Sequence, residues 1–337
     1  MSKIYEALRQ AELDRANSGV APSDSSKSTG QAVLDHENVA TADLNRTATP
    51  LATIAPISKH GLLGAALADT KTNPENAIAP PQLAERSAFD LLTATPHLWS
   101  PVYSQFPALE ERGSTVEQFR SLRSRLQEFR DLNKIKSVLV SSGLPQEGKS
   151  FIAANLAISL ARHKGGKVLL IDGDMRRARL HTMLGTEQGP GLTEYLAGGA
   201  SIAEIVQSAA IGEAGKSLPL GLSSLFFIPA GNEHDKAGDL SGNHRFEKLI
   251  TAVAPSFDWI IVDSSPVNLV SDGVNLARSC DAVLLVARGG VTKYEAAQRA
   301  VAELKASKLV GVVLNAVRNP VAAGGYYGYD GYDKIEA

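Results

Sequence analysis

Gly143-Leu144-Pro145-Gln146-Glu147-Gly148-Lys149-Ser150 matches the phosphate-binding pattern G-x-x-x-x-G-K-[ST] at every constrained position. Residues 137–141, directly before it, form a short apolar and β-branched run that predicts a buried strand, and residues 151–161 predict a helix. In this context the backbone N–H groups of the loop and of the helix N-terminus favour an anion. Lys149 adds a positive charge for the β- and γ-phosphates, and the Ser150 hydroxyl suits Mg²⁺. The stretch therefore predicts a nucleotide site.

Composition describes an ordinary globular chain. Its 337 residues are 44% apolar and 21% charged, which allows a sizeable core and suggests about two domains. A net charge of −2 gives no electrostatic case for nucleic acid as a partner. A single cysteine, Cys280, excludes an internal disulfide framework and a cysteine metal site. No apolar run approaches the roughly 20 residues that span a bilayer, and the charged start does not resemble a signal peptide, so we expect a cytoplasmic protein.

Four regions follow from the pattern along the chain. Residues 1–16 predict a short amphipathic helix, either a docking peptide or a frayed helix of no consequence. Residues 17–112, rich in Ala, Ser, Thr and Pro, predict a disordered linker. Residues 113–320 predict the nucleotide-binding domain, and residues 321–337 a flexible tail that contains Tyr326, Tyr327, Tyr329 and Tyr332.

Apolar runs alternate with helical patterns within the predicted domain. Beyond the first strand, we expect strands at residues 167–171, 224–229, 259–262, 282–287 and 309–314. We expect helices at 114–132, 151–161, 191–196, 203–210, 246–253 and 292–307, the first capped by Ser114 or Thr115, and a loop at 231–245 in which His234 lies at the surface. Strands alternating with helices predict an α/β fold with a doubly wound, mostly parallel sheet, which together with the phosphate loop is a P-loop NTPase.

Acidic residues follow two of these strands. Asp172 and Asp174 come directly after the second strand, and Asp263 ends the strand that begins at Trp259. Because ligands of open α/β sheets bind at the carboxyl ends of the strands, these positions suit a site next to the phosphate loop. On the first helix, Glu117, Arg120 and Arg123 are spaced by three and form a polar ridge, which is either a solvated face or a contact surface.

Several motifs together resemble the bacterial tyrosine kinases of capsule and exopolysaccharide biosynthesis, from residue 113 to the C-terminus. They are P-x-E-G-K-S at 145–150, the hydrophobic run with D-x-D-x-R at 168–176, Asp263-Ser264-Ser265-Pro266, the segment 311–315, the tail tyrosines and the ridge E-x-x-R-x-x-R. In relatives that ridge mediates ring assembly, so the resemblance implies a homo-oligomer formed through Glu117, Arg120 and Arg123.

The resemblance implies ATP-dependent phosphorylation of tyrosine hydroxyls, mainly on the tails of neighbouring copies, with ATP and Mg²⁺ as cofactors. The implied roles divide the site residues as follows: catalysis by Lys149, Asp172, Asp174 and Arg176; nucleotide binding by Gly143, Gln146, Glu147, Gly148, Lys149, Ser150, Phe151 and Asn315; metal binding by Ser150, Asp172 and Asp263; phosphate acceptance by Tyr326, Tyr327, Tyr329 and Tyr332. Arg176 either neutralises developing charge or pairs with a nearby acid.

Partners are also implied by the resemblance. The chain is similar to the split form of the family, in which a separate polysaccharide chain-length regulator of the inner membrane activates the kinase and recruits it. A counteracting phosphatase completes the set, and no nucleic acid is expected. The activity would regulate polysaccharide polymerisation and export.

Two alternatives stay open, and the loop departs from the family in places. One alternative is an ATPase switch that organises the polysaccharide machinery without kinase activity. The other is a positioning ATPase of the partitioning and division-site type, which carries an additional lysine where this chain has Leu144. Gln146 stands where family loops commonly have Gly, and Ser265 stands where the D-x-P-P motif has Pro.

Overall fold

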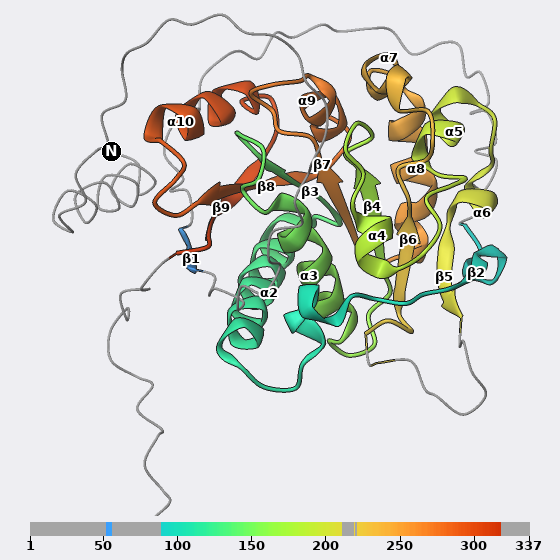
Figure 1. Cartoon of the computed structure of the whole chain (residues 1–337), viewed down its shortest axis with the longest axis horizontal. Helices are drawn as coiled ribbons and strands as arrows, with labels where there is room; N and C mark the ends of the chain where they lie inside the picture. The colour runs from blue at the N-terminus through green and yellow to red at the C-terminus, as the bar shows by residue number, and fades with distance from the viewer. Residues whose placement is uncertain (1–51, 56–88, 211–218, 220, 318–337) are drawn as a thin grey trace, which may run out of the picture.

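The computed structural model describes residues 52–55, 89–210, 219 and 221–317. In this part of the chain nine strands form one sheet in the order β1-β9-β8-β3-β7-β4-β6-β5-β2 (Figure 1). The strands are β1 (Ala52–Ala55), β2 (Thr95–Leu98), β3 (Ser137–Ser142), β4 (Val168–Gly173), β5 (Gln207–Ala210), β6 (Leu225–Ile228), β7 (Trp259–Ser264), β8 (Ala282–Arg288) and β9 (Leu309–Asn315). Strands β9 to β6 of this order are parallel, whereas β1 on β9 and β5 on β6 are antiparallel. The mostly parallel sheet is confirmed.

Helices cover both faces of the sheet (Figure 1). On one face lie α2 (Ser114–Asn133), α3 (Lys149–Ala161) and α4 (Leu180–Leu184). On the other lie α5 (Leu192–Ala197), α6 (Ile202–Ile205), α7 (Ala237–Ser241), α8 (Arg245–Val253), α9 (Asp272–Ala277) and α10 (Tyr294–Glu303). Short 3₁₀ turns are η1 (Leu91–Thr93), η2 (Tyr103–Gln105), η3 (Pro107–Leu109), η4 (His234–Lys236) and η5 (Ala254–Ser256). None of the helices in the described ranges is long and apolar enough to cross a bilayer.

The core explains why the central strands are continuous apolar runs. Successive strand residues point to opposite faces, so Val138 and Val140 join the cluster beneath α2 and α3, while Leu139 joins the cluster on the other face. All six residues of β3, of β4 and of β7 are buried. A sheet covered on both faces needs apolar side chains at every position, which gives the runs seen in the sequence.

Residues 89–112 correct the predicted linker, because the structure packs them on the domain. Phe106 is 1% exposed, and the Trp99 ring meets Phe227 edge-on at 6.3 Å between ring centroids. Asn155 of α3 ties the segment down, since its Nδ2 donates to the Gln105 carbonyl (2.9 Å) and its Oδ1 accepts the Ala108 N–H (3.1 Å). Strand β2 pairs with β5, and β1, also within the predicted linker, pairs with β9. Sparse apolar residues without a period gave no local signal for this packing.

Three local expectations are also corrected. Helix α2 begins after Gly113, so Ser114 and Thr115 lie inside its first turn and do not cap it. Residues 207–210 form β5 rather than the end of a helix, because they pair with β6 on one side and β2 on the other. The stretch 231–245 is not a plain loop, since it contains η4 and α7. In the last two cases tertiary contacts override local preference.

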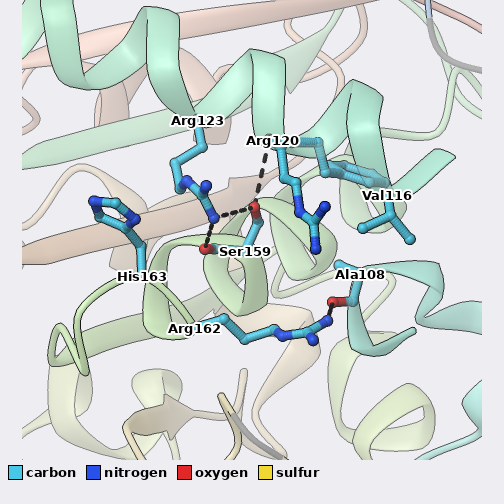
Figure 2. Close-up of a pocket in the computed structure, with 8 residues that line it drawn as sticks. Ala108, Val116, Arg120, Arg123, Ser159, Arg162 and His163 are labelled. Carbon is cyan, nitrogen blue, oxygen red and sulfur yellow. Dashed lines mark hydrogen bonds between the residues drawn. The ribbon is translucent and has the colours of Figure 1, made fainter. Parts of the chain in front are cut away.

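Helix α2 packs along α3 on the side towards β1, an edge strand of the sheet (Figure 1). The Phe119 and Phe151 rings lie 5.9 Å apart. Arg123 Nη1 donates to the Ser159 carbonyl at 2.9 Å (Figure 2). Arg120 pairs with Glu117 one turn earlier. The predicted ridge is therefore partly used in contacts within the chain.

Candidate nucleotide and phosphoryl-transfer site

The loop between β3 and α3 has the backbone shape that a phosphate cradle requires. Gly148 directly precedes α3 with φ 92°, and a Cβ there would lie 2.0 Å from Asn315 Nδ2. Gln146 also has a positive φ, 62°. This conformation costs a non-glycine residue roughly 1–2 kcal/mol, which explains why glycine suits this position in similar loops. Glutamine in place of the usual glycine at position 146 therefore adds backbone strain. It does not change the groups that contact phosphate.

Contacts from distant elements hold the loop in this shape. Glu147 is 3% exposed, and its carboxylate accepts the Leu144 N–H (2.8 Å) and the Thr292 hydroxyl. Asn315 Nδ2 donates to the Glu147 carbonyl (2.9 Å), and Arg288 Nη1 donates to the Gln146 carbonyl (3.3 Å). Thr292 and Arg288 lie more than 140 residues from the loop, so sequence reasoning missed them, and no short-range motif marks them.

Parallel pairing brings the three predicted acids to the same edge as the loop. Strand β7 lies between β3 and β4, and its Asp263 is in register with Asp172 of β4 and with Val140 of β3. Asp172 and Asp263 are fully buried, and Asp174 is 3% exposed. The positions that sequence reasoning grouped together by motif are therefore neighbours in space.

Asp174 is the acid that contacts the loop lysine directly. Its Oδ2 lies 2.7 Å from Lys149 Nζ, and its Oδ1 accepts the Arg177 N–H (3.2 Å) and the Ser265 hydroxyl (3.3 Å). Burial lowers the pKa of Lys149, but Asp263, Asp174 and Asp172 together outweigh this effect and raise it. Lys149 is therefore a firmly protonated cation facing three carboxylates.

Asp172 and Asp263 have carboxylate oxygens that accept no hydrogen bond from the described residues. Asp172 Oδ2 accepts the N–H groups of Arg179 (3.1 Å) and Leu180 (3.0 Å), whereas its Oδ1 has no hydrogen-bond partner within the described residues. Within the same residues neither oxygen of Asp263 accepts a hydrogen bond of good geometry, although the Ser150 hydroxyl lies close enough to lower its pKa. Burial and the charge of Asp263 raise the pKa of Asp172 to about 8. Burial raises that of Asp263 to about 6, against the opposing effects of Lys149 and Ser150.

These orphaned oxygens fit a hard divalent cation. Mg²⁺ binds oxygen ligands and is commonly held by one or two carboxylates together with substrate phosphates. Asp172, Asp263 and the Ser150 hydroxyl supply such oxygens next to the phosphate loop. The donor set therefore fits a magnesium ion bound together with a nucleotide.

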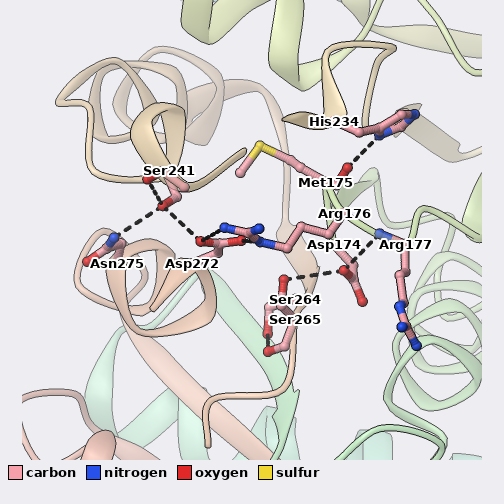
Figure 3. A network of polar contacts seen from close by, with 11 residues as sticks. Asp174, Met175, Arg176, Arg177, His234, Ser241, Ser264, Ser265, Asp272 and Asn275 are labelled. Atoms are coloured by element: carbon pink, nitrogen blue, oxygen red, sulfur yellow. Dashed lines mark hydrogen bonds and ion pairs between the residues drawn. The ribbon is translucent and has the colours of Figure 1, made fainter. Parts of the chain in front are cut away.

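Arg176 is bound to an acid that the sequence did not single out. Its Nε donates to Asp272 Oδ2 at 2.6 Å, and Asp272, at the start of α9, is fully buried (Figure 3). Ser241 of α7 lies 3.5 Å from the other Asp272 oxygen and accepts from Asn275 Nδ2 (3.1 Å). Of the two alternatives for Arg176, the structure shows the ion pair. The Arg176–Asp272 pair ties the segment after β4 to α7 and α9.

His234 corrects another expectation. It is half-buried, and its Nδ1 donates to the Met175 carbonyl (Figure 3). Its Nε2 lies 2.8 Å from Gln188 Nε2. The histidine thus braces the same segment from η4. Isolated histidines in a polar stretch carry no signal for such a contact.

The remaining predicted residues do not join this cluster. The Phe151 ring packs towards α2, and the side chains of Glu117, Arg120 and Arg123 lie along α2 and the C-terminal half of α3. Asn315 contacts the loop backbone. The helix predicted at residues 1–16 and the tail tyrosines Tyr326, Tyr327, Tyr329 and Tyr332 lie outside the described residues.

Fold and site together define a class of P-loop nucleotide-binding domains. The family model described as "CobQ/CobB/MinD/ParA nucleotide binding domain" matches residues 138–325, more than half of the chain. The matched span contains the phosphate loop and all three acids.

Similar proteins narrow the family further. The chain is 33% identical to "Tyrosine-protein kinase CpsD" of Streptococcus agalactiae over 223 residues, which cover 65% of this chain and 91% of the relative. It is 31% identical over 223 residues to "Tyrosine-protein kinase YwqD" of Bacillus subtilis, covering 65% of this chain and 89% of the relative. The solved kinase domain of the Escherichia coli tyrosine kinase ETK superposes with a TM-score of 0.58 at 28% identity, covering 67% of this chain and 85% of that domain. The solved BceF tyrosine kinase domain gives 0.53 at 30% identity, covering 63% and 81%. This chain belongs to the bacterial tyrosine kinases within the CobQ/CobB/MinD/ParA family.

Proposed function

We propose that this chain is an ATP- and Mg²⁺-dependent protein-tyrosine kinase. One observation carries the proposal: three buried carboxylates meet beside Lys149 at the phosphate loop, and two of them have oxygens without partners in the described part of the chain. Membership of the bacterial tyrosine kinases supports the chemistry, since curated relatives at 31–33% identity bear the name tyrosine-protein kinase.

The nucleotide would bind along Gly143–Ser150 and the start of α3. Loop N–H groups and Lys149 would hold the β- and γ-phosphates, and Ser150, Asp172 and Asp263 would hold the metal. When bound, Mg²⁺ neutralises negative charge on the phosphates. Glu147 and Asn315 hold the loop through the contacts described above. Direct contact of Asn315 with the nucleotide remains a prediction.

In the reaction, a phenol oxygen forms a bond to the γ-phosphorus while the bond to the β-phosphate oxygen breaks, and the phenol proton passes to a carboxylate. We assign the proton to Asp174 rather than Asp172. Asp172 is committed to two backbone N–H groups, whereas Asp174 is paired with Lys149, which phosphates would draw away. Arg176 would have to leave Asp272 to neutralise developing charge, so we expect its main role to be holding the segment after β4.

Acceptors and partners extend the proposal beyond the described residues. The acceptors would be Tyr326, Tyr327, Tyr329 and Tyr332 of neighbouring copies, assembled through Glu117, Arg120 and Arg123. An inner-membrane chain-length regulator would activate and recruit the kinase, with residues 1–16 as a docking peptide, and a phosphatase would reverse the modification. The pathway would be polysaccharide polymerisation and export.

The direct test is phosphotyrosine formation by the purified full chain. With ATP and Mg²⁺ we expect phosphotyrosine that mass spectrometry maps to the tail. Lys149→Met removes the charge that faces the phosphates and should lower the rate by at least about a hundredfold. Lys305→Met, which changes an exposed lysine beyond α10, is the matched control and should leave the rate unchanged. Undiminished phosphotyrosine in Lys149→Met contradicts the assignment.

A second variant separates the kinase from an ATPase switch. Replacing all four tail tyrosines by Phe should abolish autophosphorylation and leave nucleotide binding intact. If the wild-type chain hydrolyses ATP and assembles with nucleotide but forms no phosphotyrosine, the ATPase switch would be favoured.

A further inference from the structure

A polar pocket lies between α2, η3 and the C-terminal end of α3, apart from the nucleotide site. Its volume is about 230 Å³. Arg120 and Arg123 enter it from α2, and Arg162 and His163 from the residues that follow α3 (Figure 2). Val116 and Phe119 of α2 also line it. Since α3 has 13 residues, the pocket lies about 20 Å along the helix from the phosphate loop.

The positive charge of the pocket is only partly matched. Arg120 pairs with Glu117, the single carboxylate that contacts these guanidinium groups within the described residues. Arg123 donates to the Ser159 carbonyl at 2.9 Å. Arg162 donates to the carbonyls of Ala108 and of Glu110, the latter at 2.6 Å. Two of the three arginines therefore contact neutral oxygens, and the pocket keeps an excess of positive charge.

The arginines of the pocket also have N–H groups left to donate to a ligand. A guanidinium carries five N–H donors, and contacts with backbone carbonyls at the end of α3 use only part of that capacity. Arg123 Nε is buried and has no hydrogen-bond partner within the described residues. Burial, Arg120 and Arg162 lower the pKa of Arg123, so the guanidinium groups are close enough to repel one another. The contacts of Arg123 and Arg162 with backbone carbonyls could serve only to cap helices. Capping would not explain why three arginines surround the same cavity.

We propose that this pocket binds a phosphate group. Arginine forks match the oxygen geometry of phosphate, and a dianion balances the excess charge better than a single carboxylate does. The group can come from inorganic phosphate or from a phosphotyrosine side chain, whose ring can stack on a guanidinium plane. Only the phosphotyrosine source rests on the proposed kinase function.

The test titrates inorganic phosphate into the full chain carrying Lys149→Met, which weakens the competing phosphate loop. Protein concentration is kept where light scattering shows a monomer, and ionic strength is constant. We expect saturable binding by calorimetry. Arg123→Gln and Arg162→Gln should each weaken it about tenfold or more, because each removes a charge-assisted contact. Arg299→Gln, the same change at an exposed position of α10, should have no effect.

Folding of the variants is checked through the other site. Arg162→Lys keeps the charge and should retain most of the phosphate affinity, and MgADP affinity measured with Lys149 present should be unchanged in all pocket variants. Absence of phosphate binding, or equal binding by the arginine variants that still bind MgADP, overturns the proposal.

A second arm identifies the source of the phosphate. O-phosphotyrosine should bind more tightly than inorganic phosphate, and tyrosine should not bind, if the aryl group stacks on the arginine side chains. Equal affinities reject the aryl source and leave the phosphate site in place. Because none of these measurements uses kinase turnover, their failure is distinguishable from failure of the proposed kinase function.

Discussion

Replacing Asp263 by Asn should stabilise the chain in the absence of nucleotide and magnesium. Asp263 is fully buried and lies opposite Asp172, and burial raises its pKa from 3.8 to about 6. A carboxyl whose pKa is higher in the folded state than in the unfolded state opposes folding once it ionises. The penalty is absent well below pH 3.8, grows between pH 3.8 and 6, and is complete above pH 6.

The size of the effect follows from that shift. From the two pKa values, ionisation of Asp263 reduces the unfolding free energy by about 3 kcal/mol at pH 7.5 and by about 1 kcal/mol at pH 4.5. The substitution also removes the charge that helps to raise the pKa of Asp172. We therefore expect the unfolding free energy of Asp263→Asn to exceed that of wild type by about 3 kcal/mol at pH 7.5, and by about a third of that at pH 4.5.

The assay is urea unfolding at both pH values, in EDTA and without nucleotide. Glu128→Gln removes an exposed carboxylate in the middle of α2 and should change stability by less than about 0.5 kcal/mol. With MgADP the order should reverse, because the orphaned oxygens of Asp263 are proposed metal ligands and their loss removes the stabilisation by ligand. A variant no more stable than wild type at pH 7.5, or a gain that does not shrink at pH 4.5, refutes the reasoning.

Three further predictions concern the supporting contacts. Gln146→Gly should raise the unfolding free energy by up to about 1 kcal/mol by relieving the positive φ, with nucleotide affinity, measured by calorimetry, unchanged within about threefold. Arg176→Ala leaves the buried carboxylate of Asp272 without its cation and should lower the unfolding free energy in urea by about 3–5 kcal/mol. Asp272→Asn should lower it less, because the half-exposed Arg176 can turn to solvent. Equal losses would contradict this asymmetry. Phe106→Ala should cost about 3–5 kcal/mol if residues 89–112 belong to the domain, and a thermal unfolding midpoint like that of wild type would place them outside it.

Sequence patterns were sufficient to predict the class of fold, the phosphate loop and the acids beside it. Near-continuous apolar strands can only be buried on both faces, so their alternation with helices determined a mostly parallel, doubly wound sheet. The phosphate loop and the acids after two strands follow local rules as well, because the carboxyl ends of parallel strands share one edge. That reasoning placed Asp172 and Asp263 together, and the observed register agrees.

Only the tertiary structure decided which distant groups complete these elements. Asp272 holds Arg176 from 96 residues away, and Thr292 holds Glu147 from 145 residues away. Residues 89–112 join the core through Phe106 and through Asn155 of α3. The pocket around Arg123 and Arg162 likewise exists only where α2 crosses the end of α3. Periodicity and motifs report contacts between near neighbours in the chain, whereas pairing of buried charges depends on which strands and helices the fold sets side by side.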